Sequence, residues 1–136
     1  MLLLLSGLAI AQPDTGDTDF ARANQLSKDH AYKEALPIYQ NLMERFPDDA
    51  STLWNTGITA QFCDDWATAL KAWNKMATLE PENWKVRSTK IQVYQGMGKL
   101  AERDSERQAL LAYRVARQWV ADILTNKKKP ASSSHS

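Results

Sequence analysis

Cysteine, histidine, glycine and proline are all scarce in this chain of 136 residues, which has one cysteine, two histidines, five glycines and five prolines. A single cysteine excludes an intramolecular disulfide framework and any metal site built from several cysteines. With so few turn-forming residues, an architecture of many short strands is disfavoured. An excess charge of one sign is lacking too: the formal net charge is +1, which disfavours an electrostatic nucleic-acid binder. The composition therefore favours helices and names no chemistry.

Hydrophobic residues make up 43% of the chain and charged residues 24%, as in an ordinary globular domain. The exception is residues 1–11, MLLLLSGLAIA, an uncharged apolar run that ends in the A-x-A pattern of a signal-peptidase site. The run is too short to span a membrane, and no basic residue precedes it. We expect a signal peptide that is truncated at its start or weak. A periplasmic or secreted location follows, or a cytoplasmic one if the segment is not a signal.

The remaining chain divides by composition into three parts. Residues 12–17 form a polar linker containing proline and glycine, and residues 18–125 carry the periodic apolar pattern of a single domain. Residues 126–136 form a tail rich in lysine and serine, which we expect to be disordered.

The domain contains an internal repeat with a period of 34 residues. Shifting the chain by this period superimposes small residues, aromatic residues and prolines on residues of the same kind. The aligned pairs are Phe20/Trp54, Ala23/Gly57, Tyr32/Trp66, Ala35/Ala69, Leu36/Leu70, Tyr39/Trp73, Leu42/Met76 and Pro47/Pro81.

Each repeated residue type has a structural reason. The small residues permit two helices to cross closely, and the aromatic residues fill the space toward the next unit. The prolines end a helix because proline has no N–H to donate, and Asp49 and Asn83 then offer side-chain oxygens as N-caps for the following helix. Asp65 is a further candidate N-cap.

This arrangement resembles the tetratricopeptide repeat, a helix–turn–helix unit. The resemblance covers units 16–49 and 50–83 fully and unit 84–117 in part. It implies an all-α fold, a short right-handed α-solenoid of about three helix pairs that ends in a long capping helix. It also implies a bacterial, exported protein that binds other proteins. Periodicity places helices near residues 18–29, 33–46, 50–62, 66–79, 84–95 and 100–125.

The third unit departs from the pattern. Arg103 replaces the small residue of the second helix, and Arg107 replaces the aromatic one. Beyond them, Ala109, Ala112, Ala116, Trp119 and Ile123 recur at steps of three and four residues, which predicts one apolar stripe. We interpret this helix as the cap of the stack. The competing interpretation is a partner-binding helix, because Trp119, Val120 and Leu124 exceed what a minimal cap needs.

An enzymatic function is not supported by the residues present. The two histidines lie far apart in the chain and form no ligand cluster, and we expect no metal and no cofactor. Cys63 and His30 both fall at turns between helices, but nothing obvious orients the histidine as a base. The acidic pairs Asp48-Asp49 and Asp64-Asp65 precede helix starts, where capping and the helix dipole explain them.

The surface with the strongest functional prospect is the concave groove lined by the first helix of each pair. Amide groups there would bond the backbone of an extended peptide or a helix, and an apolar strip would receive a side chain. The predicted groove residues are Phe20, Asn24, Lys28, Trp54, Asn55, Ile58, Gln61, Phe62, Lys85 and Gln92.

Three of these positions also resemble the carboxylate clamp with which some tetratricopeptide proteins grip a chaperone tail. Asn24, Asn55 and Lys85 match that clamp, whereas Phe20 and Thr89 stand where it has cations. Losing two of three cations removes most of the grip on a carboxylate. We therefore expect a protein partner in a generic peptide groove, and neither nucleic acid nor a membrane span. The alternative is an assembly subunit of an envelope complex that forms oligomers through the C-terminal helix.

Overall fold

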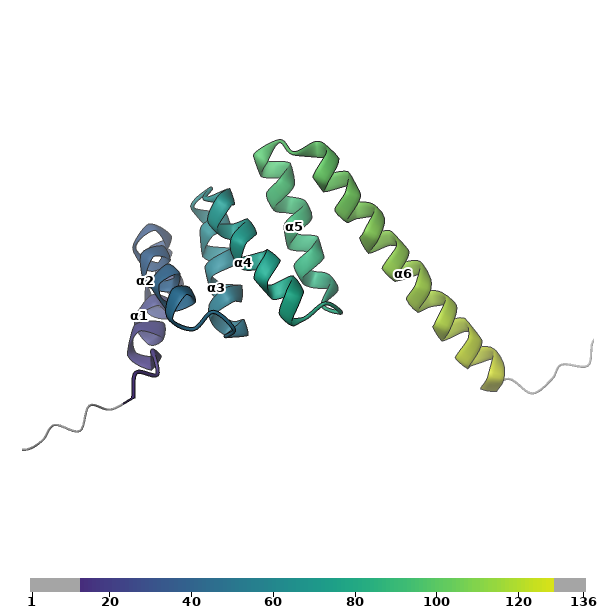
Figure 1. The fold of residues 1–136 in the computed structure, drawn as a ribbon, viewed down its shortest axis with the longest axis horizontal. Helices are drawn as coiled ribbons and strands as arrows, with labels where there is room; N and C mark the ends of the chain where they lie inside the picture. Colours follow the sequence, from purple (N-terminus) through teal and green to yellow (C-terminus); the bar gives the residue numbers. More distant parts are fainter. Residues whose placement is uncertain (1–12, 129–136) are drawn as a thin grey trace, which may run out of the picture.

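The computed structural model describes residues 13–128, which form six helices and no strand within that range (Figure 1). Their bounds are α1 Asp17–Lys28, α2 Tyr32–Arg45, α3 Ala50–Phe62, α4 Trp66–Leu79, α5 Trp84–Met97 and α6 Leu100–Lys128. Each begins and ends within three residues of its predicted position. The predicted signal peptide and residues 129–136 of the predicted tail lie outside the described residues, whereas residues 126–128 belong to α6.

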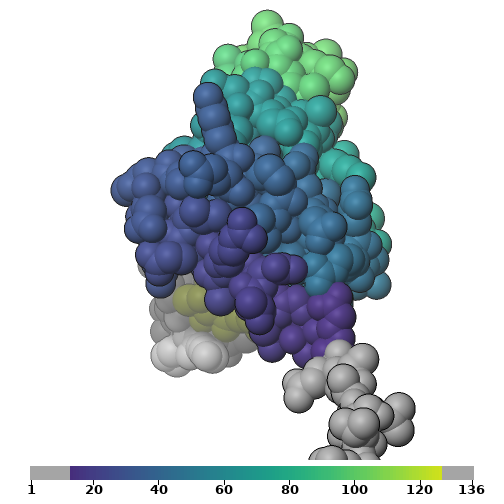
Figure 2. Space-filling view, turned by 90° about the vertical axis from the view of Figure 1, so that its left-hand side faces the viewer, coloured from purple at the N-terminus to yellow at the C-terminus, as the bar shows by residue number. Residues whose placement is uncertain are grey.

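The six helices form three consecutive hairpins. Each helix packs against its neighbours in sequence, so that α1–α2, α3–α4 and α5–α6 follow one another along the molecule (Figure 1). Seen from the N-terminal side, α1 and α2 lie in front and the later units rise behind them (Figure 2). The long helix α6 diverges from α5 and extends past the stack (Figure 1). The fold is thus the all-α solenoid that the repeat predicts.

Side-chain caps begin the later helices. The carboxylate of Asp49 accepts the backbone N–H of Thr52 at 2.9 Å, and Asp65 accepts that of Thr68 at 3.1 Å. Asn83 does the same for the N–H of Lys85 at 3.1 Å. All three predicted N-caps are confirmed, because each oxygen satisfies a donor that the first helical turn leaves without an intrahelical partner.

Tyr39 and Trp73 occupy equivalent places in successive hairpins. Both side chains are fully buried, and each packs against the small residue predicted for the crossing, Ala23 or Gly57. A β-carbon added to Gly57 would lie 2.5 Å from ring atoms of Trp73. The larger indole therefore requires glycine where the first unit has alanine.

The third hairpin is held by charged and polar groups instead of small apolar ones. The carboxylate of Glu106 accepts from Arg87 at 2.8 Å and from Lys90 at 2.9 Å, and both Glu106 and Lys90 are largely shielded from water. Arg103 donates to the amide oxygen of Gln95 at 2.6 Å. This polar interface explains why the repeat pattern breaks in α6: the α5–α6 contact uses ion pairs where earlier hairpins use alanine.

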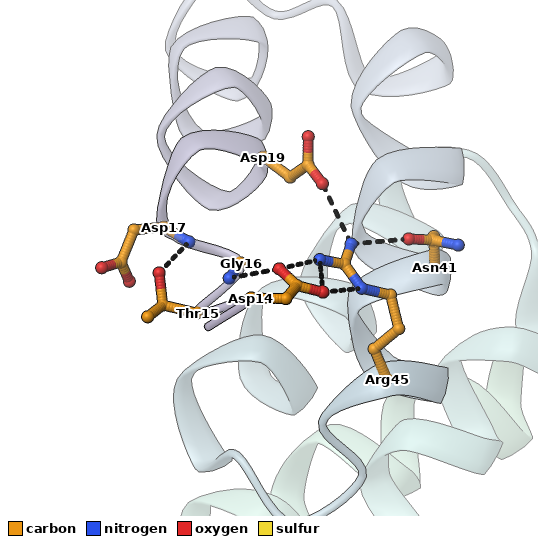
Figure 3. A network of polar contacts seen from close by, with 7 residues as sticks. All are labelled: Asp14, Thr15, Gly16, Asp17, Asp19, Asn41 and Arg45. Atoms are coloured by element: carbon orange, nitrogen blue, oxygen red, sulfur yellow. Dashed lines mark hydrogen bonds and ion pairs between the residues drawn. The ribbon is translucent and has the colours of Figure 1, made fainter. Parts of the chain in front are cut away.

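A network around Arg45 closes the N-terminal end of the stack (Figure 3). Its guanidinium donates to the carboxylates of Asp14 and Asp19 and to the Asn41 amide oxygen. The hydrogen bond from Arg45 lowers the pKa of Asp14. Residues just before α1, expected to be linker, are thereby tied to the end of α2.

Candidate partner-binding surfaces

The first helices α1, α3 and α5 carry nine of the ten predicted groove residues. We call the surface that they form the first-helix face; its residues are Phe20, Asn24, Lys28, Trp54, Asn55, Ile58, Gln61, Lys85 and Gln92. The side-chain amide of Gln61 donates to the amide oxygen of Gln92 at 3.4 Å, which joins α3 to α5. The structure therefore brings the polar residues of two adjacent first helices together on one surface.

Several residues of the first-helix face also support the core. The ring of Phe20 meets the edge of Tyr39 with centroids 6.1 Å apart, and Trp54 meets Trp73 in the same manner at 5.0 Å. Gln61 accepts the indole N–H of Trp73 at 2.9 Å. These contacts fix the face rigidly, because each side chain is held by a buried aromatic ring of the second helix.

Asn24 accepts the hydroxyl proton of Tyr39, and Asn55 donates to the carbonyl oxygen of Ser51 at 2.8 Å. Both asparagines are half-buried, whereas Lys28, Lys85 and Gln92 are exposed. The face therefore offers water-exposed cations and amides over an immobile base.

Phe62 lies apart from the other predicted groove residues. Its ring stacks on that of Tyr32 at the start of α2, with centroids 4.3 Å apart and an interplanar angle of 6°. Together with His30 and Cys63 it lines a shallow hollow of about 300 Å³ beside the inter-helix turns. Burial raises the pKa of the Cys63 thiol, so the thiolate needed for nucleophilic chemistry is disfavoured.

Helix α6 presents a second surface, which sequence reasoning recognised only in part. We call it the α6 stripe; its residues are Leu111, Ala112, Val115, Ala116, Trp119, Val120, Ile123 and Leu124. The larger members, Ile123 excepted, are between 49% and 65% exposed. Leu111 and Val115 were missed, although they lie four residues apart and four before Trp119, the spacing of one helix face.

A hollow of about 590 Å³ opens between the start of α5 and the middle of α6. Trp84 and Tyr113 line it with Arg114 and Arg117, and the Tyr113 hydroxyl donates to the carbonyl oxygen of Glu82 at 3.3 Å. None of these residues was predicted as functional. The signal that was available is the pair of arginines three residues apart, which share a helix face.

Two further searches concern only residues 13–128. No group of three or more histidine, cysteine, aspartate or glutamate side chains is placed there to hold a metal ion. None of the helices in that part of the chain has an apolar stretch long enough to cross a lipid bilayer.

The geometry defines a class of fold: a helical-repeat solenoid of the tetratricopeptide type. A solved structure of MamA AMB-1, a tetratricopeptide-like helical protein, superimposes on this chain with a TM-score of 0.67 at 16% sequence identity. The match covers 76% of this chain and 62% of MamA, so the chain spans less than two thirds of that protein's length. The sequence matches no protein-family model and no curated protein. The likeness establishes the fold.

Proposed function

We propose that this protein is a non-enzymatic interaction module that holds an extended peptide or a helix of a partner protein on its first-helix face. The observation that carries the proposal is the hydrogen bond from Gln61 to Gln92, which makes one polar surface of α3 and α5. A surface whose base is already immobile loses little conformational entropy when a ligand binds. Micromolar affinity, about −8 kcal/mol, suits a site of this size.

The chemistry of the face favours particular ligand features. Exposed Lys28 and Lys85 attract acidic side chains, and the amides of Asn55 and Gln92 can pair with a peptide backbone. Ile58 and Trp54, both half-buried, supply the apolar contact. This combination supports an acidic ligand with one apolar anchor residue.

The test uses peptides selected from a random phage-displayed library on the full chain. The double variant Asn55→Ala with Lys85→Ala should weaken the selected peptides at least about tenfold, because it removes one amide and one cation from the face. Trp54 is a poor choice for substitution because its ring packs on Trp73 in the core.

The matched control is Asn74→Ala with Lys71→Ala, which removes the same side chains from exposed positions of α4. Fluorescence titration should give unchanged affinity for this variant. Equal weakening by both double variants, or weakening by the control alone, would place the peptide elsewhere and refute the proposal.

The second candidate function is that of an assembly subunit associating through α6. The specific observation in its favour is the exposure of Leu111, Val115 and Trp119 along one side of the helix. A contiguous apolar surface of this kind is typical of a protein–protein contact.

We also propose that the protein is exported to the periplasm or secreted. This proposal rests on the sequence of residues 1–11 alone, which ends in Ala9-Ile10-Ala11. An assembly role in an envelope complex would fit that location.

A further inference from the structure

The α6 stripe lies on the side of α6 that faces away from α5. The residues that contact α5 or are shielded by it, Arg103, Glu106 and Leu110, follow one another at steps of three and four. At 3.6 residues per turn, Ala112, Ala116 and the rest of the stripe fall on the opposite side. No other helix of the described chain packs against that side. A partner helix can therefore approach it without meeting α5.

We propose that the α6 stripe binds the α6 stripe of a second copy, with the two helices antiparallel. This inference deepens the second candidate function, since it names the partner of α6, and it does not depend on peptide binding at the first-helix face.

The first argument is the match of large to small side chains. Ala109, Ala112, Ala116, Trp119 and Ile123 are separated by three, four, three and four residues, which is the seam of a two-helix coiled coil. Antiparallel pairing that sets Ala116 against the partner's Trp119 also sets Ala112 against the partner's Ile123. The two-fold axis repeats both layers, so each large side chain meets a small one.

The flanking residues agree with the same register. Leu111 comes opposite the partner's Leu124, and Val115 opposite the partner's Val120. A parallel pair in register would instead place Trp119 against the partner's Trp119, and alanine against alanine, which leaves gaps between the helices.

Charge supports the antiparallel direction. Asp122, whose carboxylate now accepts from Gln118 at 2.8 Å, lies at the edge of the stripe. In the antiparallel register it comes within one residue of the level of the partner's Arg114, whereas a parallel pair brings two Asp122 carboxylates together. Arg114 and Arg117 line the hollow toward Trp84, so they do not oppose each other across the seam.

The rest of the chain offers no comparable surface for head-to-tail growth. Among the described residues of α1, the exposed side chains are polar or small: Asp17, Thr18, Ala21, Arg22, Gln25 and Lys28. The Arg45 network covers the same end with ion pairs (Figure 3). A stripe that pairs with itself closes after two copies and leaves no open end.

The exposed area is large enough for a dimer. Five large side chains that are about half exposed or more contribute roughly 500 Å² per copy, given about 150–250 Å² for a whole aromatic side chain. Two copies together remove roughly 1,000 Å² from water, which is where specific interfaces begin.

The first experiment measures the mass of the full chain by sedimentation velocity from about 1 to 100 µM. We expect a dimer whose dissociation constant rises at least about 30-fold in Trp119→Glu and in Val115→Glu, since a charge then lies in the seam. Both side chains are exposed, so circular dichroism should show unchanged helix content. The control is Phe62→Glu, because Phe62 is 62% exposed against 65% for Trp119, and its dimer should persist.

The second experiment determines the direction of the helices. A spin label on Ser105→Cys, in a Cys63→Ser chain, should lie about 40 Å from its copy, because Ser105 is well before the two-fold axis and a helix rises 1.5 Å per residue. A parallel pair would give a distance near 10 Å.

The outcomes separate the alternatives. A monomer at every concentration overturns the proposal, and binding of that monomer to anionic phosphatidylglycerol vesicles would assign the stripe to a lipid surface. A dimer that survives both glutamate variants, or that Phe62→Glu disrupts, overturns it as well, as does the short label distance. The variant Asn55→Ala with Lys85→Ala should remain dimeric, so failure of the peptide proposal is recognised separately.

Discussion

At the scale of single residues, the two complete repeats differ by coordinated substitutions around one buried ring. Where Tyr39 becomes Trp73, the small residue beneath it changes from Ala23 to Gly57. The partner of the ring's polar atom changes as well: the hydroxyl of Ser27 lies 3.5 Å from the Tyr39 hydroxyl, whereas Gln61, one repeat later, reaches the indole N–H. Size and hydrogen bonding are thus matched together, because both are decided within one close-packed layer.

This match predicts that Gly57→Ala destabilises the protein although alanine favours helices. The added β-carbon would meet Trp73 ring atoms at 2.5 Å, and such overpacking costs about 1–3 kcal/mol. Adding Trp73→Tyr recreates the alanine–tyrosine pair of the first unit and should recover about 1 kcal/mol relative to Gly57→Ala alone. Urea unfolding of the wild type, both single variants and the double variant measures this coupling. Strictly additive free energies of unfolding would contradict the repeat equivalence.

At the scale of elements, the two ends of the stack are closed in different ways. The N-terminal end is closed by the ion pairs of Arg45 with Asp14 and Asp19, which need only one turn of chain before α1 (Figure 3). The C-terminal end is covered by α6, whose first half is joined to α5 through Glu106 and Arg103. Its second half extends beyond α5 with its apolar side exposed.

The Asp14 contact predicts a pH dependence with a defined sign. Because Arg45 lowers the folded-state pKa of Asp14, the contact stabilises the fold above the unfolded-state pKa of about 3.9 and is lost as the pH falls through the lower folded value. Asp14→Asn should therefore be less stable than the wild type at pH 7 and approach it below about pH 4. Chemical denaturation across this range tests the prediction.

The matched control is Glu44→Gln, which removes an exposed carboxylate of the same helix as Arg45. Its stability difference from the wild type should not follow the pH course of Asp14→Asn. An Asp14→Asn effect that is constant from pH 7 to about pH 2 would contradict the assigned role of the Arg45 contact.

At the scale of the whole molecule, the two proposed surfaces are separate. The first-helix face is built on α1, α3 and α5, and the α6 stripe belongs to a helix that leaves the stack (Figure 1). Pairing through α6 would therefore join two stacks and leave both first-helix faces open. A dimeric scaffold of this form would hold two copies of a ligand, and a divalent ligand would gain avidity from it.

Export of the protein predicts a defined cleavage. Mass spectrometry of the protein recovered from its host envelope or medium should show a chain that begins at Gln12, because cleavage follows Ala11 in the A-x-A pattern. Replacing Ala11 with a bulky residue such as phenylalanine should block this processing. An intact chain recovered from the cytoplasm would refute the proposal.

The repeat made the fold predictable to a depth unusual for a chain of this size. Because small, aromatic and proline residues recur 34 residues apart, the position of Tyr39 implied the position of Trp73, and both are buried as expected. The candidate sites were less predictable. Periodicity shows which residues share a helix face, but it does not show that Phe62 turns toward Tyr32 instead of joining Ile58.

The sequence by itself determined the six helices, their caps and the pairing of consecutive helices, because these depend on contacts between neighbours in the chain and on local backbone chemistry. Only the tertiary structure decided how far α5 covers α6. That depends on the angle at which two packed helices diverge, and it leaves Leu111, Val115 and Trp119 exposed. Three-dimensional packing also brought Gln61 to Gln92 and Arg45 to Asp14, 31 residues apart in each case, since a long-range contact needs the whole stack in place.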